Sequence, residues 1–162
     1  MNTNEKPKRG GKAAVIASAL AALGAVALFT VDREGNELDS YRDIVGVWTV
    51  CAGVTGPDAG PGKRYTAEQC DALNQRKIAE YLTAVAGCVE RPLSEGQWVA
   101  VGSWSYNVGI RAACNSTLMG QLNAGVSAEV WCKQLLRWDY ASGKRVRGLT
   151  LRREAEYREC VK

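Results

Sequence analysis

Three side chains in the first third of the sequence have types and a spacing that suit chemistry on a sugar. Glu34, Asp43 and Thr49 follow the pattern E-x8-D-x5-T. Cleavage of a glycosidic bond needs two carboxyl groups. One gives a proton to the leaving oxygen, and the other directs a water molecule or stabilises the developing positive charge. Hydrolysis of a glycoside is therefore the first hypothesis.

The residues around Asp43 and Thr49 indicate a small hairpin that would position them. Residues 44–50, IVGVWTV, are rich in β-branched and aromatic residues and contain Gly46, as is common where two strands meet. The pattern alone leaves structural alternatives open. Glu34 as an exposed carboxylate at a helix start, Asp43 as a turn residue and Thr49 as a strand residue fit the same letters.

The segment resembles the phage-type lysozymes of glycoside hydrolase family 24, and among them the lambdoid endolysins with a signal-arrest-release segment. The resemblance covers residues 32–162. It continues in Ser105-Tyr106-Asn107-Val108-Gly109, Ser116-Thr117-Leu118, Arg137-Trp138, Gly148-Leu149 and Arg152-Arg153-Glu154. It implies an α+β, mainly helical lysozyme-like fold with a small β-hairpin lobe, plus an N-terminal apolar helix. Residues 1–31 would form a basic N-terminus and signal-arrest-release segment, and residues 32–162 the lysozyme domain.

The resemblance implies a role for each residue of the pattern. Glu34 corresponds to the general acid, Asp43 to the carboxylate that stays ionised, and Thr49 to the residue that holds the water. The reaction would be inverting hydrolysis of the β-1,4 bond between N-acetylmuramic acid and N-acetylglucosamine in peptidoglycan, which lyses the host cell. A general acid must be protonated to act, so the site of Glu34 is expected to be partly desolvated.

Other residues near the proposed site have less specific signals. Arg152 or Arg153 is expected to approach Glu34, and the sequence does not choose between them. Glu37 and Asp39 are rival carboxylates, which we interpret as solvated.

Three further residues correspond by position to family residues that line the sugar cleft. These are Thr55, Tyr106 and Thr117, and Tyr106 could stack on a sugar ring or pack in the core. The sequence departs from the family in one stretch: where many relatives carry histidines before Thr55, this chain has Ala52 and Val54. The departure leaves the proposed catalytic residues untouched.

Composition excludes several other kinds of active site. The chain has no histidine, which excludes Ser-His-Asp hydrolases, Cys-His proteases and histidine-ligated zinc. No C-x-x-C pair is present, so thiolate-ligated zinc and thioredoxin-like chemistry are not expected. The resemblance implies neither a metal nor an organic cofactor. Of the net charge of +4, residues 1–12 contribute +3 through four basic residues and one acidic residue. Glutamates dilute the basic residues of 144–153, so nucleic-acid binding is not expected.

Six cysteines are spread along the chain. An even number favours three disulfides in an oxidising compartment, with buried free thiols as the alternative. Spacing does not choose the pairing. The resemblance implies pairs between sequence neighbours, and the missing histidines would make local stability depend more on the first pair. The implied pairs are Cys51 with Cys70, Cys88 with Cys114, and Cys132 with Cys160.

Residues 13–31, AAVIASALAALGAVALFTV, carry no charge and follow a basic start. As one helix they would just cross a hydrocarbon core, with the N-terminus inside. Eight of these residues are alanine, and Ser18, Gly24 and Thr30 lower the hydrophobicity further. The segment is therefore a marginal membrane span.

Three interpretations of residues 13–31 are open: a signal peptide cleaved after Ala25-x-Ala27, a permanent anchor, and a reversible anchor. The resemblance implies the third. The protein would face the periplasm from the host inner membrane, then become a soluble periplasmic monomer. While the segment spans, Glu34 would stay at the membrane surface, because three extended residues reach only about 10 Å. Leucines in place of alanines would lock the enzyme off, and deletion of residues 1–31 would free Glu34.

Two other functions stay open at this stage. One is a non-catalytic wall-binding or membrane-tethered protein on a lysozyme scaffold, and the other is a secreted lysozyme with a cleaved leader.

The remaining sequence predicts helices. Capping boxes at Thr66-x-x-Gln69 and Ser94-x-x-Gln97 predict two helix starts, the first helix running over 67–87. The second helix carries a core stripe that includes Trp98 and Trp104. Further helices are predicted at 117–123, 127–139 and 150–160, with a turn between Gly143 and Gly148.

Overall fold

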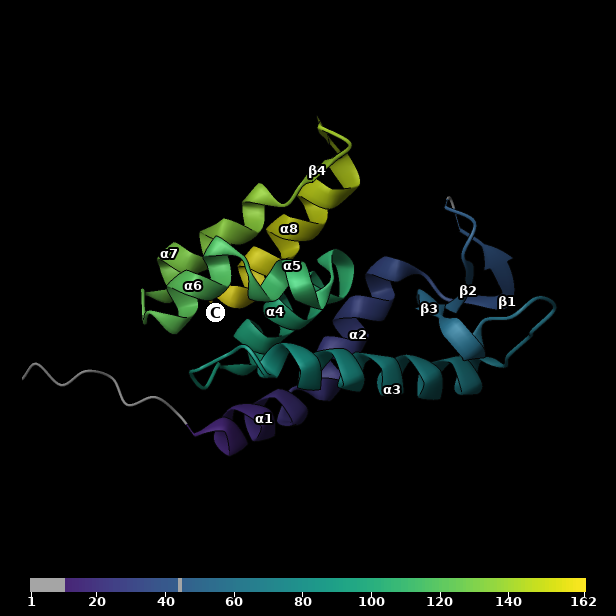
Figure 1. Ribbon diagram of the computed structural model, residues 1–162, viewed down its shortest axis with the longest axis horizontal. Helices are drawn as coiled ribbons and strands as arrows, with labels where there is room; N and C mark the ends of the chain where they lie inside the picture. The colour runs from purple at the N-terminus through teal and green to yellow at the C-terminus, as the bar shows by residue number, and fades with distance from the viewer. Residues whose placement is uncertain (1–10, 44) are drawn as a thin grey trace, which may run out of the picture.

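A computed structural model describes residues 11–43 and 45–162 (Figure 1). Helices make up most of the molecule, and a small antiparallel sheet stands at one end, on the right in Figure 1. This is the mainly helical α+β fold that the sequence predicts. The basic residues Lys6, Lys8 and Arg9, and Ile44 of the predicted hairpin, lie outside the described residues.

The small sheet has three strands in the order β1-β2-β3, all antiparallel. Asp43 N donates to Val47 O and closes the turn between β1 and β2. The predicted run 44–50 therefore supplies the turn and the second strand, while the first strand is the polar segment before it. The strands are β1 (Glu37–Arg42), β2 (Trp48–Cys51) and β3 (Val54–Thr55).

Helix α3 (Ala67–Ala86) connects the sheet to the helical part (Figure 1). Its first turns help to form the small core under the sheet, with Cys70 and Leu73 buried there. Its later turns enter the main core with Ile78 and Leu82. The predicted capping box of Thr66 and Gln69 is present at its start.

Helix α4 (Glu95–Val108) is the centre of the main core, and every residue from Trp98 to Ser105 is buried. Such a helix has no solvent face for most of its length, because α2, α3, α5 and α8 pack around it. Gly102 allows the close approach of α2 and α3. A Cβ there would lie 2.7 Å from Val26 Cγ1 and 2.9 Å from Leu82 Cδ2.

The C-terminal half differs from the predictions in two places. The predicted helix 127–139 is divided into α7 and a 3-10 helix, and α8 begins at Arg147, before the predicted 150. Gly143 lies in a two-residue hairpin turn, as predicted. Gly148 instead lies inside α8, because the helix begins directly after Val146, an extended residue that separates it from the hairpin. The elements are α5 (Ile110–Cys114), α6 (Thr117–Asn123), α7 (Ala128–Trp131), η2 (Cys132–Arg137), β4 (Tyr140–Ala141), β5 (Lys144–Arg145) and α8 (Arg147–Cys160).

The apolar leader forms two helices rather than one, α1 (Lys12–Ala21) and α2 (Leu23–Glu34), bent by 55° at Ala22. One side of the pair packs against α3 and α4 as part of the main core. Within the described residues no single helix is long and apolar enough to cross a membrane, although the bent pair together has the length and composition. The fully buried leader side chains are Val15, Ala19, Val26 and Thr30.

Polar residues of the leader also contact the rest of the fold. Lys12 Nζ donates to Gly87 O at 2.5 Å and to Val89 O at 3.1 Å, and so satisfies carbonyl groups at the end of α3. Ser18 Oγ accepts a hydrogen bond of 2.9 Å from the buried indole of Trp98. The same serine that weakens the segment as a membrane span thus supplies a partner that the indole needs in the core.

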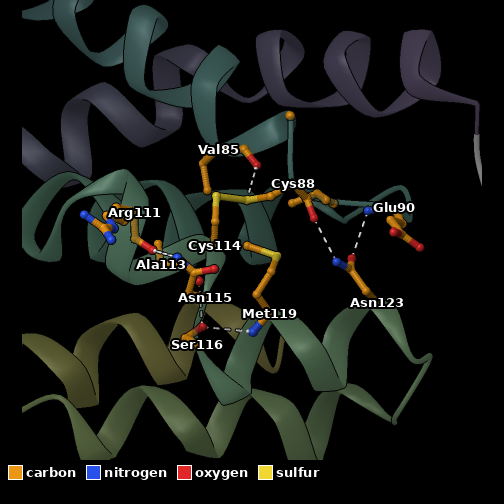
Figure 2. Close-up of a disulfide and its surroundings, with 12 residues drawn as sticks. Val85, Cys88, Glu90, Arg111, Ala113, Cys114, Asn115, Ser116, Met119 and Asn123 are labelled. Carbon is orange, nitrogen blue, oxygen red and sulfur yellow. Dashed lines mark hydrogen bonds between the residues drawn. A yellow bond between two sulfur atoms is a disulfide. The ribbon is translucent and has the colours of Figure 1, made fainter.

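Three disulfides are present, with the pairing that the resemblance implies: Cys51–Cys70, Cys88–Cys114 and Cys132–Cys160. Figure 2 shows the second of these, which connects the end of α3 to α5. Asn123 reinforces this connection, because its side chain donates to Cys88 O and accepts from Glu90 N.

Replacement of Gly102 by alanine tests the close packing of the leader on α4. The added methyl group would overlap Val26 and Leu82, so we expect the free energy of unfolding to fall by about 1–3 kcal/mol. Gly120→Ala in α6 is the matched control, because no atom lies within 4 Å of its Cβ position and alanine favours a helix. Denaturant unfolding measures both, and equal stability of the two variants would contradict the packing.

Candidate active site

Glu34 is the last residue of α2, so the leader helix places the proposed acid. Its Oε1 lies 2.5 Å from Nη1 of Arg152 on α8, and the two side chains are 22% and 9% exposed. Of the two arginines that the sequence offered, Arg152 is therefore the partner. Burial of a charged group is costly unless it is paired, and this ion pair connects two helices that are far apart in sequence.

Arg152 belongs to a buried cluster of charges. Its Nε lies 3.2 Å from Glu156 Oε1, and its Nη2 donates to Ser103 O. Ser103 Oγ donates to the same Glu156 oxygen at 2.7 Å. On the other side, Arg153 Nε lies 3.0 Å from Glu156 Oε2, at an angle that makes an ion pair but not a hydrogen bond. Glu156 is fully buried between the two guanidinium groups.

The pKa values in this cluster reflect competition between burial and charge. Burial lowers the pKa of Arg153 to about 10, which leaves it positive at neutral pH. Burial also raises the pKa of Glu156, and Arg153, the Ser103 hydroxyl and Arg152 oppose this rise. Because two buried guanidinium groups without an anion would cost more than one buried carboxylate, we treat Glu156 as ionised at neutral pH.

Asp43 lies in the turn between β1 and β2, where its carboxylate orders the backbone. Oδ1 accepts hydrogen bonds from Val45 N at 3.0 Å and from Val47 N at 2.8 Å. Among the described residues Oδ2 has no partner, so one oxygen fixes the side chain while the other is available to a ligand. The structural role of a turn residue and the predicted role are both compatible with this arrangement.

Thr49 and Thr55 are placed side by side by the sheet. They are directly opposite each other on β2 and β3, and Thr49 is opposite Tyr41 on β1, so the three side chains share one face. Thr49 is buried, and its hydroxyl donates to Val47 O at 3.2 Å. Its oxygen keeps the capacity to accept a hydrogen bond from water.

Tyr106 connects α4 to the sheet beside Glu34. Its hydroxyl donates to Ala52 O at 3.0 Å, and its ring centroid lies 4.8 Å from that of Tyr81. A Cβ on Gly53 would lie 3.8 Å from Tyr106 Cε1 and 3.9 Å from Glu34 Oε2. Burial, and then the charge of Glu34, raise the pKa of Tyr106. The structure thus brings together Glu34, Tyr106 and the β2–β3 turn.

Asn74 is a site residue that the sequence analysis did not identify. Its Oδ1 accepts from Ala52 N at 3.0 Å, and its Nδ2 donates to Asn36 Oδ1 at 3.3 Å. It is buried, and it ties both the sheet and the segment after Glu34 to α3. The sequence feature that could have identified Asn74 is its position, as a polar residue next to Leu73 on the apolar face of a predicted helix.

Thr117 is not in this neighbourhood. It is the exposed first residue of α6 and lines a separate cavity of about 310 Å³ with Leu118, Gln134, Arg137 and Trp138. Among residues 11–43 and 45–162, no three Asp, Glu or Cys side chains gather as a metal site would require.

Comparison with known proteins identifies the family of this chain. The family model described as phage lysozyme matches residues 31–156. The chain belongs to this family. The match begins within α2, just before Glu34, and ends at Glu156, so it includes both ends of the buried charge cluster.

Two relatives and one solved structure illustrate the similarity. The SAR-endolysin of Enterobacteria phage P21 is 41% identical over 128 residues, covering 79% of this chain and 77% of that protein. The SAR-endolysin of Pseudomonas phage phiKMV is 35% identical over 160 residues, covering 96% and 92%. The muramidase domain of SpmX from Asticaccaulis excentricus has a TM-score of 0.78 and 26% identity, covering 85% and 95%.

Removal of the Cys51–Cys70 disulfide tests how the sheet is held on α3. In the double variant Cys51→Ser with Cys70→Ser, we expect the free energy of unfolding to fall by about 3 kcal/mol. We also expect faster amide exchange at Val50 and Val54, because the small core under the sheet loses its covalent link. The matched control, Cys132→Ser with Cys160→Ser, should lower the stability without selectively exposing these amides. The same exchange pattern in both variants would contradict this account.

Proposed function

We infer that this phage lysozyme is a muramidase that hydrolyses the β-1,4 bond between N-acetylmuramic acid and N-acetylglucosamine in peptidoglycan and so lyses the host cell. Its membership of the family and its endolysin and muramidase relatives support this function. The observation that carries it is the Glu34–Arg152 pair, a partly exposed carboxyl group held by a buried cation. We expect the enzyme to act as a monomer without a cofactor.

In the proposed mechanism Glu34 is the general acid. Its proton goes to the glycosidic oxygen as the bond to the anomeric carbon breaks. Asp43 is the base that directs a water molecule, through the oxygen that the turn does not use. Thr49 accepts a hydrogen bond from this water. The water oxygen attacks the anomeric carbon from the opposite face, its proton goes to Asp43, and the configuration inverts.

Three further residues are proposed to contact the substrate. Thr55 presents its side chain on the same face of the sheet as Thr49. The buried part of Tyr106 packs and positions the sheet, and its exposed edge beside Gly53 would contact a sugar. Thr117 would contact a more distant part of the wall polymer through its own cavity.

A non-catalytic wall-binding protein on the same scaffold is the alternative from another class. Such a protein needs no carboxyl group with an ion-pair partner at the position of Glu34. Retention of the Arg152 pair and of the turn around Asp43 favours the enzyme.

Glu34→Gln should reduce the rate of wall clearing by at least about 100-fold, because an amide has no proton to give to the leaving oxygen. Glu37→Gln is the matched control. It removes an exposed carboxyl group from the neighbouring strand and should keep near-normal activity. Turbidity loss of purified peptidoglycan measures both rates. Clearing by Glu34→Gln at the normal rate would sink the assignment and favour the wall-binding alternative.

We also propose that residues 1–31 are a reversible anchor for residues 32–162, first in the host inner membrane and then released into the periplasm. The α2 helix includes the end of the anchor and Glu34 without a break. Its buried residues, among them Val26 and Thr30, can contact either lipid or the core, but not both. In the inserted state the main core is therefore incomplete, and Glu34 is kept away from Arg152.

This packing changes one expectation from the sequence. The sequence alone predicts that deletion of residues 1–31 frees Glu34. In the folded protein the same deletion would also remove Val15, Ala19 and Val26 from the main core. We therefore expect the deleted protein to be destabilised rather than activated.

Leucine at Ala17 and Ala21 tests the anchor without disturbing the fold. Both alanines are exposed in α1, so the folded enzyme should accept the larger side chains, while the inserted segment gains hydrophobicity. We expect the doubly substituted protein to stay in the membrane fraction and host lysis to be delayed.

Serine at the same two positions is the matched control and should leave release unimpeded. Fractionation followed by intact-mass measurement of the soluble protein reports release, and also whether the leader is retained or cleaved. Equal release of the leucine and serine proteins would argue against a reversible anchor, and a soluble form without the leader would favour the cleaved signal peptide.

A further inference from the structure

One guanidinium group serves two carboxylates in the buried cluster. Arg152 contacts Glu34 through Nη1 at 2.5 Å and Glu156 through Nε at 3.2 Å. Ser103 fixes this arrangement, since its carbonyl accepts from Arg152 Nη2 and its hydroxyl donates to Glu156 Oε1. Both Arg152 and Glu156 are at least nine-tenths buried, so water screens their interaction little.

A single arginine at this distance creates a difficulty for a general acid. An opposite charge within a few ångströms favours the ionised form of a carboxyl group. If Arg152 acted on Glu34 alone, the ion pair would favour the carboxylate over the acid form that the proposed reaction needs. A negative charge that competes for the same guanidinium group relieves this effect.

We propose that Glu156 is a positioning residue for the acid: it shares the guanidinium group of Arg152 and so prevents the charge of Arg152 from acting on Glu34 alone. It touches neither the substrate nor the reacting atoms and acts only through Arg152. The proposal rests on the function proposed above, in which Glu34 is the general acid.

The other charged groups around Glu34 determine the sign of the effect. On α8, Arg152 and Arg153 are positive and Glu156 is negative, so the cluster presents a net charge of about +1 to Glu34. On α4, Tyr106 stays neutral because its pKa is raised. Within α2, Asp32 and Arg33 form an ion pair of 3.6 Å, and on the β1–β2 turn stands Asp43. The variants below leave the α2 and turn groups unchanged.

Glu156→Gln removes the competing charge and leaves the guanidinium group of Arg152 paired with Glu34 alone. The unopposed charge of Arg152 should then favour the carboxylate form of Glu34, so activity should be lost at a lower pH. We expect the alkaline limb of the pH–rate profile to move down by about one pH unit. Glu156→Asp keeps the charge in a shorter side chain, so its limb should stay near the wild-type position even where packing lowers its stability.

Asn107→Asp tests the opposite direction and does not disturb the buried carboxylate. Asn107 is exposed, and its Oδ1 accepts from Arg153 Nη2 at 3.0 Å. A carboxylate there adds negative charge to the cluster and should move the alkaline limb up, by roughly 0.3 pH unit. Damage to the fold alone would lower the rate in all three variants without moving the limb in opposite directions.

Carbon-13 NMR titration of the Glu34 carboxyl carbon in the full chain measures the same shift directly. An unmoved titration in Glu156→Gln, or an equal shift in Glu156→Asp, would overturn the proposal. If Glu156→Gln does not fold, Asn107→Asp decides: an upward shift supports the proposal, and no shift or a downward one overturns it. Failure of the proposed function is distinguishable, because Glu34→Gln would then retain activity whatever the Glu156 variants do.

Discussion

The ion pair between Glu34 and Arg152 is the contact on which the rest of the structure depends. It joins the end of the leader helix α2 to the C-terminal helix α8, and the two residues are separated by 118 positions in the sequence. A charge pair at this depth is tolerated only when further polar groups surround it, and Ser103 and Glu156 meet that need. The main core must therefore close around α2 before the pair can form. The proposed site is therefore complete only when the leader helix is packed in the core.

Under the reversible anchor proposed above, the leader has to suit two environments, and this accounts for its composition. A stronger membrane span would need large apolar side chains throughout, but several leader positions contact α3 and α4 too closely for them. Ala19 and Ala27 are buried there, and Gly102 of α4 receives Val26. Ser18 and Lys12, which weaken the segment in lipid or flank it, form hydrogen bonds in the folded state. Weak hydrophobicity is thus required by the packing of the folded protein, and it also makes removal from a bilayer less costly.

The sequence predicted the fold where a local rule applies, and it failed where the decision depends on packing. Capping boxes placed the starts of α3 and α4 correctly because the required side chains are neighbours in sequence. The break of the leader at Ala22 was not predicted, because the apolar run was interpreted as one helix; in the fold both halves pack against α3 and α4. Packing also decided which of Arg152 and Arg153 contacts Glu34. Adjacent residues on a helix point about 100° apart, so the rotation of α8, set by distant contacts, decided which one meets Glu34. Asn74 was missed for a related reason, since its partners Ala52 and Asn36 lie on other elements.

The sheet lobe depends on contacts with α3 as well as on its own core. Its core is small, built from a few side chains such as Val50, Val54 and Leu73, and a sheet of this size has little stability of its own. Its contacts with α3 include the Cys51–Cys70 disulfide and the Asn74 hydrogen bond to the backbone at Ala52. The first of these forms only under oxidising conditions. Because Asp43 and Thr49 both lie on this lobe, their positions relative to Glu34 depend on a covalent bond that a reducing cytoplasm would not supply. Export would then complete the site in two ways, by oxidation of the sheet lobe and by docking of the leader that carries Glu34.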